Sequence, residues 1–224
     1  MRDILLLDLD NTILDFDKSE ELALREVFNK YDIEDTKENR DLYYKINIEY
    51  WKKYEKHLIS RDLLIGYRFN DFFKSFNKKV DGFEVNEFYF KHLSSYSFYM
   101  DRAEEFLKEC QKRNYTILIA SNGVGSVQHP RIEKSGLRKY FHNVYLSEEI
   151  GYNKPDIEFY ESILKDYPFK ERMVMIGDSL SSDIQGGVNF KIPTIWYNYK
   201  HLQSDLPDYQ VDNLMDIFKI LEEI

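Results

Sequence analysis

Apolar and polar positions along this chain form two kinds of segment. Three short segments are almost unbroken apolar runs: ILLLDLD (4–10), YTILIASN (115–122) and RMVMIGD (172–178). Such runs predict strands of a parallel sheet, because helices cover both faces of that kind of sheet. Two further candidate strands are NVYLSEE (143–149) and PTIWYN (193–198).

Helical patterns lie between these runs, at residues 101–113, 130–140, 156–166 and 181–190. Strands that alternate with helices predict an α/β fold with a doubly wound, mostly parallel sheet. In such sheets, ligands bind at the carboxyl ends of the strands. We therefore expect the polar residues that end these strands to meet in one crevice.

The stretch 16–98 breaks this alternation and reads as helices without strands. Apolar residues recur there every four positions: Leu42, Ile46, Tyr50, Tyr54 and Leu58. Ser60 is a candidate N-cap for the next helix, and two more helices are expected at 19–31 and 84–97. The pattern predicts an all-helical domain inserted after the first strand.

The expected domains are a core of residues 1–15 and 99–224 and a helical cap of residues 16–98. The cap is rich in aromatic residues, among them Tyr50, Trp51, Tyr54, Phe69 and Phe73. Their helical spacing is typical of a hydrophobic core. Exposed members of the group could instead stack on a nucleobase, because aromatic faces do this well.

Composition excludes several classes of protein. The chain has 224 residues and a formal net charge of −9 without a dense Lys/Arg run, which argues against nucleic-acid polymers and anionic membrane surfaces as partners. A single cysteine, Cys110, excludes an intramolecular disulfide and a multi-cysteine metal site. No apolar run is long enough for a transmembrane helix or a signal peptide, so we expect a cytoplasmic protein, either a monomer or a homodimer.

The end of the first strand carries an unusual pair of acids. Asp8 and Asp10 are two residues apart, so in a strand both side chains point the same way. Two like charges at one point are tolerable when a divalent cation neutralises them. Ligands that are all oxygen, with room for water, favour Mg²⁺.

Other polar residues end the remaining strands. Asp178 follows the 172–178 run, and Asp183 comes five residues later. Ser121 and Asn122 begin the turn SNG, whose hydroxyl and backbone N–H groups can hold phosphate oxygens. Lys154 precedes a proline before a predicted helix. Each residue alone is common as a turn residue, a helix cap or a solvated charge, but together they supply what phosphoryl transfer requires.

In their order, DLDNT, SNG, KP and GDSLSSD resemble the four motifs of the haloacid dehalogenase superfamily, in its phosphatase branch. The resemblance implies a Rossmann-like core, and the helical insertion is similar to that family's C1-type cap. The stretch from SNGVGSVQHPRIEKSG to NKPDIEFY resembles the YjjG-type pyrimidine 5′-nucleotidases. That group implies a small phosphorylated metabolite as substrate, with nucleoside 5′-monophosphates the expected class.

The resemblance also implies roles for the catalytic and metal-binding residues. Asp8 would be the nucleophile that forms an aspartyl-phosphate. Asp10 would protonate the leaving oxygen and then activate water. The Asp8 carboxylate, the Asp10 backbone carbonyl and Asp178 would bind Mg²⁺.

Further roles follow from the same resemblance. Ser121, the Asn122 backbone and Lys154 would bind the phosphoryl group. Asp183 would support the metal site and orient Lys154, and Thr12 would brace the first loop. Pro130 departs from the continuous helix usual in this family, so the helix is expected to start or to kink there.

Three alternatives remain open at this point. A 2-haloacid dehalogenase shares the nucleophile but requires neither the metal nor an acid at position 10. A phosphatase of a non-nucleotide metabolite, such as a sugar phosphate, would use the same residues. A phosphate-sensing receiver domain also clusters acids and a lysine on a doubly wound sheet, but it would be about half as long and would lack the inserted cap.

Overall fold

The computed structural model describes residues 3–224, which divide into two compact units. One unit consists of residues 3–16 and Ser97–Ile224, and the other of Asp17–Tyr96. The first unit contains a six-stranded parallel sheet flanked by helices. The predicted doubly wound α/β fold is therefore confirmed.

The sheet has the strand order β3-β2-β1-β4-β5-β6. Its strands are β1 (Ile4–Leu7), β2 (Thr116–Ser121), β3 (Asn143–Leu146), β4 (Met173–Gly177), β5 (Thr194–Tyr197) and β6 (Tyr209–Val211). The chain moves outward from β1 to β3 and then returns to the other side of β1 with β4. The strand order therefore reverses between β1 and β4, and doubly wound sheets bind their ligands at such a point.

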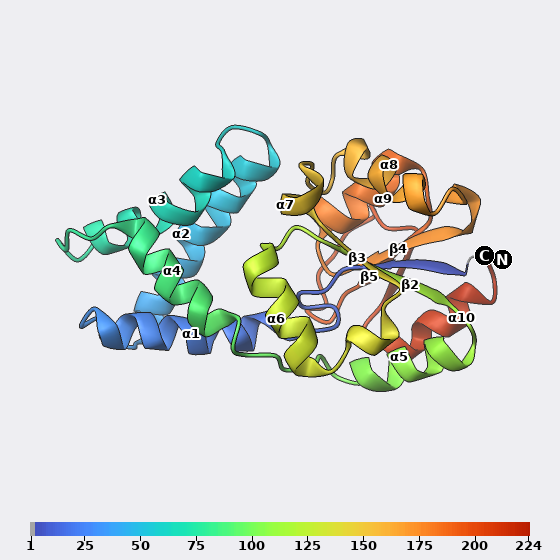
Figure 1. Cartoon of the computed structure of the whole chain (residues 1–224), viewed down its shortest axis with the longest axis horizontal. Coiled ribbons are helices and arrows are strands. Elements are labelled where there is room, and N and C mark those ends of the chain that lie inside the picture. The colour runs from blue at the N-terminus through green and yellow to red at the C-terminus, as the bar shows by residue number, and fades with distance from the viewer. Residues whose placement is uncertain (1–2) are drawn as a thin grey trace. The chain divides into compact units, whose positions relative to one another are not determined.

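Helices cover both faces of the sheet, as Figure 1 shows, with α5 and α10 on one face and α8 and α9 on the other. The helices of this unit are α5 (Ala103–Lys112), α6 (Gly125–Ser135), α7 (Ser147–Ile150), α8 (Ile157–Asp166), α9 (Gln185–Phe190) and α10 (Ile217–Leu221). Successive strand residues point to opposite faces. Leu5 and Leu7 accordingly pack in the cluster that contains α5 and α10, and Leu6 in the cluster that contains α8.

Three local predictions need correction. The expected strand 143–149 ends at Leu146, because residues 147–150 form the helical turn α7. Strand β6 was not predicted. Helix α6 starts at Gly125 rather than at Pro130, since the Val124 carbonyl accepts the N–H groups of Val127 (3.0 Å) and Gln128 (2.9 Å). Pro130 lies inside this helix, and Gly136 ends it with a positive φ of 73°.

The second unit contains the four predicted helices. They are α1 (Phe16–Lys30), whose first residue belongs to the other unit, α2 (Lys37–Glu55), α3 (Arg61–Lys74) and α4 (Gly82–Leu93). The Ser60 side chain accepts the Leu63 N–H (3.3 Å), so the predicted N-cap of α3 is confirmed. Phe69 and Phe73 are fully buried and belong to the hydrophobic core, whereas Trp51 is half-buried on α2.

A buried polar network joins the four helices of this unit. Arg68 of α3 donates to Asn47 of α2 (2.7 Å) and Asn86 of α4 (2.8 Å). Glu20 of α1 accepts hydrogen bonds from Asn47 (3.2 Å) and from Tyr89 of α4 (3.1 Å). Because buried polar groups are costly without partners, this network favours one alignment of the helices over slipped ones.

The chain leaves and re-enters the first unit through paired segments. Leu14 and Tyr99 form an antiparallel bridge. The Asp15 N–H donates to the Phe98 carbonyl (2.9 Å), and the Met100 N–H donates to the Ile13 carbonyl (3.0 Å). Among the helices of residues 3–224, none is long and apolar enough to cross a membrane.

Candidate active site

Three acidic side chains meet at the carboxyl ends of β1 and β4. Leu7 of β1 is in register with Ile176 of β4, and the Asp8 N–H donates to the Ile176 carbonyl (2.9 Å). Asp8 and Asp178 each follow directly after their strand. One carboxylate oxygen from each of Asp8, Asp178 and Asp183 lies within 4.8 Å of the other two. The structure thus brings together acids that are more than 150 residues apart in sequence.

Lys154 is the cation at this cluster. Its Nζ lies 2.8 Å from Asp8 Oδ1 and 2.6 Å from Asp183 Oδ1, and it also donates to the Ala120 carbonyl. The Lys154 side chain is only 1% exposed, so these oxygens replace water as its hydrogen-bond partners. A buried ammonium held in this way is fixed in position next to the Asp8 carboxylate.

The electrostatics of the cluster favour a further cation. Burial, together with the charges of Asp183 and Asp10, raises the pKa of Asp8 to about 7 against the opposing effect of Lys154. Burial and the charges of Asp8 and Asp183 raise the pKa of Asp178 well above its ordinary value. Burial alone would lower the pKa of Lys154, but Asp183 and Asp8 together raise it.

One ammonium cannot neutralise three carboxylates, so the ionised cluster keeps a net negative charge. Its donor atoms are all oxygen, the ligand type that hard divalent cations prefer. The residues present therefore fit Mg²⁺, which the carboxylates of Asp8, Asp178 and Asp183 could hold.

Asp183 lies in a single π-helical turn that follows β4. The turn spans Leu180–Ile184, and the Ser179 N–H donates to Asp183 Oδ2 (3.0 Å). A Cβ at Gly177 would lie 2.2 Å from the same Oδ2 atom. Only glycine leaves room for Asp183 to reach Lys154, a role that the sequence pattern GD did not reveal.

The end of β2 contributes Ser121 and Asn122. Ser121 is 1% exposed, and its Oγ accepts the Gly123 N–H (3.0 Å). The Asn122 side chain pairs twice with the Lys154 backbone: its Nδ2 donates to the carbonyl (2.9 Å), and its Oδ1 accepts the N–H (2.8 Å). The Asn122 side chain therefore positions the segment that carries Lys154, whereas the sequence pointed only to the Asn122 backbone.

Asp10 is oriented differently from Asp8. Its carboxylate accepts hydrogen bonds from Gln128 and Arg131 of α6, two residues that the sequence analysis did not single out. They are three positions apart on one helix, which places them on the same face. Thr12 is fully buried, but its hydroxyl has no hydrogen-bond partner among the described residues, so no such bond supports its predicted role in bracing the loop.

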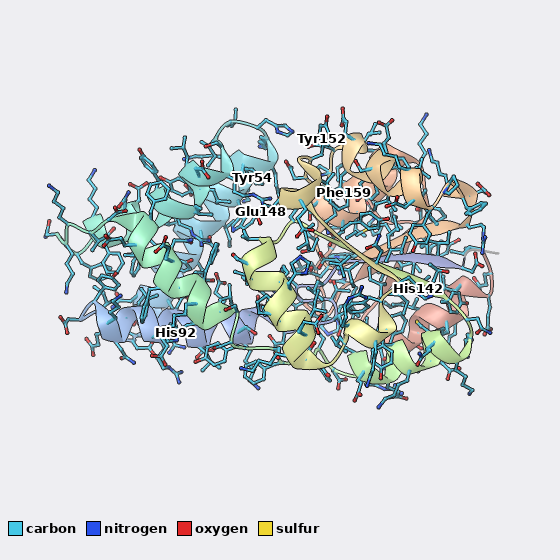
Figure 2. The ribbon with its side chains drawn as sticks, in the orientation of Figure 1. Tyr54, His92, His142, Glu148, Tyr152 and Phe159 are labelled. Atoms are coloured by element: carbon cyan, nitrogen blue, oxygen red, sulfur yellow. The ribbon has the colours of Figure 1, made fainter. Side chains whose placement is uncertain are left out.

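The start of α6 is occupied by a carboxylate of the protein itself. Glu148, labelled in Figure 2, lies on α7 and accepts the Gly125 N–H (2.7 Å). The neighbouring Glu149 contacts His129 (2.6 Å). The Gly123 and Gly125 N–H groups thus already have protein acceptors, which leaves fewer backbone donors for a phosphate than the SNG turn suggested.

The chain is similar to several known proteins. Residues 5–197 match the family described as haloacid dehalogenase-like hydrolase. Pyrimidine 5′-nucleotidase PynA of Streptococcus pneumoniae is 37% identical over 98% of this chain and 94% of its own length. Pyrimidine 5′-nucleotidase YjjG of Escherichia coli is 29% identical over 98% and 97%. The crystal structure of the HAD-hydrolase YfnB of Bacillus subtilis, bound to magnesium, has a TM-score of 0.93 and 30% identity over 99% of each chain.

Proposed function

Because this chain belongs to the haloacid dehalogenase-like hydrolases, we propose that it is a Mg²⁺-dependent phosphatase of nucleoside 5′-monophosphates. Two similar proteins, PynA and YjjG, are named pyrimidine 5′-nucleotidases and align with almost the whole chain. That full coverage includes the cap as well as the core. It supports a nucleotide over a sugar phosphate as substrate.

In the proposed reaction, Asp8 attacks the phosphorus atom and forms an aspartyl-phosphate while the bond to the leaving oxygen breaks. Asp10 gives its proton to that leaving oxygen and then takes a proton from the water that hydrolyses the intermediate. Lys154, 2.8 Å from Asp8, holds the nucleophile and balances the charge of the phosphoryl group. Mg²⁺ bound to Asp8, Asp178 and the Asp10 carbonyl would supply additional positive charge.

The observation that carries this proposal is Lys154 between Asp8 and Asp183, with Asp10 two residues from the nucleophile. A halide leaving group needs no proton, so a dehalogenase has no use for an acid at Asp10. A nucleoside alkoxide is a poor leaving group and does need one. The second carboxylate therefore favours phosphate ester hydrolysis.

Phosphate release from a panel of pyrimidine and purine nucleotides and sugar phosphates tests the proposal. We expect the wild type to release phosphate fastest from nucleoside monophosphates, and EDTA to stop the reaction. Asp8→Asn should abolish release, whereas the matched change Asp205→Asn at an exposed position should not. Turnover by Asp8→Asn equal to wild type would exclude Asp8 as nucleophile, and EDTA-resistant activity on 2-haloacids alone would identify a dehalogenase.

A further inference from the structure

The Asp10 carboxylate accepts hydrogen bonds from two side chains of α6. Arg131 Nη1 donates to Asp10 Oδ1, and Gln128 Nε2 donates to Asp10 Oδ2. Arg131 is fully buried and Gln128 is 1% exposed. A buried arginine is costly unless it is paired, and the Asp10 carboxylate provides that partner.

The Gln128 amide has only one orientation that satisfies its neighbours. Arginine has donors and no acceptor, so the Gln128 oxygen must face Arg131, and that contact is 2.8 Å. The Gln128 NH₂ group then faces Asp10 and lies 3.5 Å from Ser121 Oγ. Both oxygens of Asp10 consequently meet N–H donors, which is the environment of a carboxylate fixed in place.

Arg131 is also held from a second side. Its guanidinium carbon lies 5.5 Å from the centre of the Phe16 ring, within the range of a cation–π contact. Gln128 and Arg131 are themselves joined by the 2.8 Å hydrogen bond and lie three positions apart on helix α6. The pair is therefore a rigid clamp rather than two mobile surface side chains.

We infer that Gln128 and Arg131 are positioning residues that fix Asp10 for both of its proton transfers. The inference rests on the proposed function. In the first transfer the Asp10 proton passes to the leaving oxygen as the Asp8–phosphorus bond forms, which leaves a carboxylate that the clamp accepts. In the second, water attacks phosphorus and gives a proton to Asp10, and the Asp8–phosphorus bond breaks to release inorganic phosphate.

Two substrates separate this role from a general structural one. A nucleoside monophosphate needs a proton on its leaving oxygen, whereas 4-nitrophenolate leaves without one. For Arg131→Met we expect kcat on the nucleotide to fall by up to about 10²–10⁴-fold, the range of a general acid–base contribution, with little change in KM. With 4-nitrophenyl phosphate, rapid mixing should show a burst of nitrophenolate stoichiometric with enzyme, followed by slow turnover, because only the hydrolysis step is impaired.

Non-additivity provides the decisive readout. The kinetic effects of two substitutions that act through one group are not additive. The double variant Asp10→Asn/Arg131→Met should therefore be no slower than Asp10→Asn alone. Arg113→Gln, which removes an exposed arginine paired with Glu109 (2.7 Å), is the matched control and should retain wild-type kinetics. Gln128→Leu removes one donor without removing charge, so it decides the question if Arg131→Met does not fold.

Wild-type kcat in both Arg131→Met and Gln128→Leu would overturn the inference, as would additive losses in the double variant. The inference would also be overturned if a folded Arg131→Met variant lost both the nitrophenolate burst and the steady turnover of 4-nitrophenyl phosphate. That pattern indicates a damaged site around the nucleophile. If the wild type itself released no phosphate from any ester, the proposed function would fall first, and the inference with it.

Discussion

Replacing Asp8 with Asn should stabilise the protein in the absence of divalent cations, even though it removes the proposed nucleophile. Asp8 is 7% exposed and is surrounded by Asp178, Asp183 and a single buried ammonium. Asparagine keeps the shape of the side chain, and its oxygen can still accept from Lys154. The substitution therefore removes an unfavourable buried charge at small cost in packing.

The size of the effect follows from the pKa of Asp8, which burial and the neighbouring acids raise from 3.8 to about 7. Between these two pH values the folded state keeps a proton that the unfolded chain releases, so stability falls as the pH rises through this window. A rise of about three pKa units at about 1.4 kcal/mol each corresponds to about 4 kcal/mol at pH 8. At pH 5 most of the penalty is absent, and the expected difference is under about 2 kcal/mol.

Urea unfolding in EDTA, followed by circular dichroism at pH 5 and pH 8, measures both values. Asp8→Asn should unfold at a higher urea concentration than wild type at pH 8, and the gap should shrink at pH 5. Asp205→Asn, an exposed control, should match wild type at both pH values. A wild type as stable as Asp8→Asn at pH 8, or a gap independent of pH, would refute the reasoning.

Three further predictions concern the same cluster. Lys154→Met leaves Asp8 and Asp183 buried without their cation, so urea unfolding at pH 8 should show that the free energy of unfolding falls by about 3–5 kcal/mol. A fall below about 1 kcal/mol, the size expected for an exposed ion pair, would contradict this. Mg²⁺ should raise the melting temperature of the wild type more at pH 8 than at pH 5.5, because protons compete with the metal for Asp8. In Asp178→Asn most of that rise should be lost, and an undiminished rise would exclude Asp178 as a ligand. Gly177→Ala places a methyl group 2.2 Å from the Asp183 carboxylate. It should lower kcat, and it should lower the free energy of unfolding by about 1–3 kcal/mol. Wild-type values for both would show that Asp183 can move without any effect on turnover or stability.

The strands of the core could be predicted because each signal is local. The runs that became β1, β2 and β4 are buried on both faces, so their apolar character is continuous and easy to recognise. Their parallel arrangement then brings Asp8 and Asp178 to the same edge of the sheet. Strand β6 has only three residues, and none of them is fully buried, so nothing in its composition distinguishes it from a loop.

The contacts between side chains could not be predicted in the same way. Asn122 binds the Lys154 backbone across 32 positions, and Gln128 and Arg131 contact Asp10 across 118 and 121 positions. These partners depend on how α6 packs against the loop after β1, which no local pattern specifies. The single hint was the spacing of Gln128 and Arg131 on one helical face directly after the SNG turn.

The paired segments at the base of the helical insertion also bear on how such proteins diversify. Because Leu14 and Tyr99 form a bridge and Asp15 bonds to Phe98 (2.9 Å), the inserted chain starts and finishes at the same spot on the sheet unit. An exchange of everything between these residues would leave every strand, and the acids Asp8, Asp178 and Asp183, in their original connectivity. Recombination at this junction would therefore change the substrate and keep the reaction. An insert from a related protein should join the core without any change in the sheet.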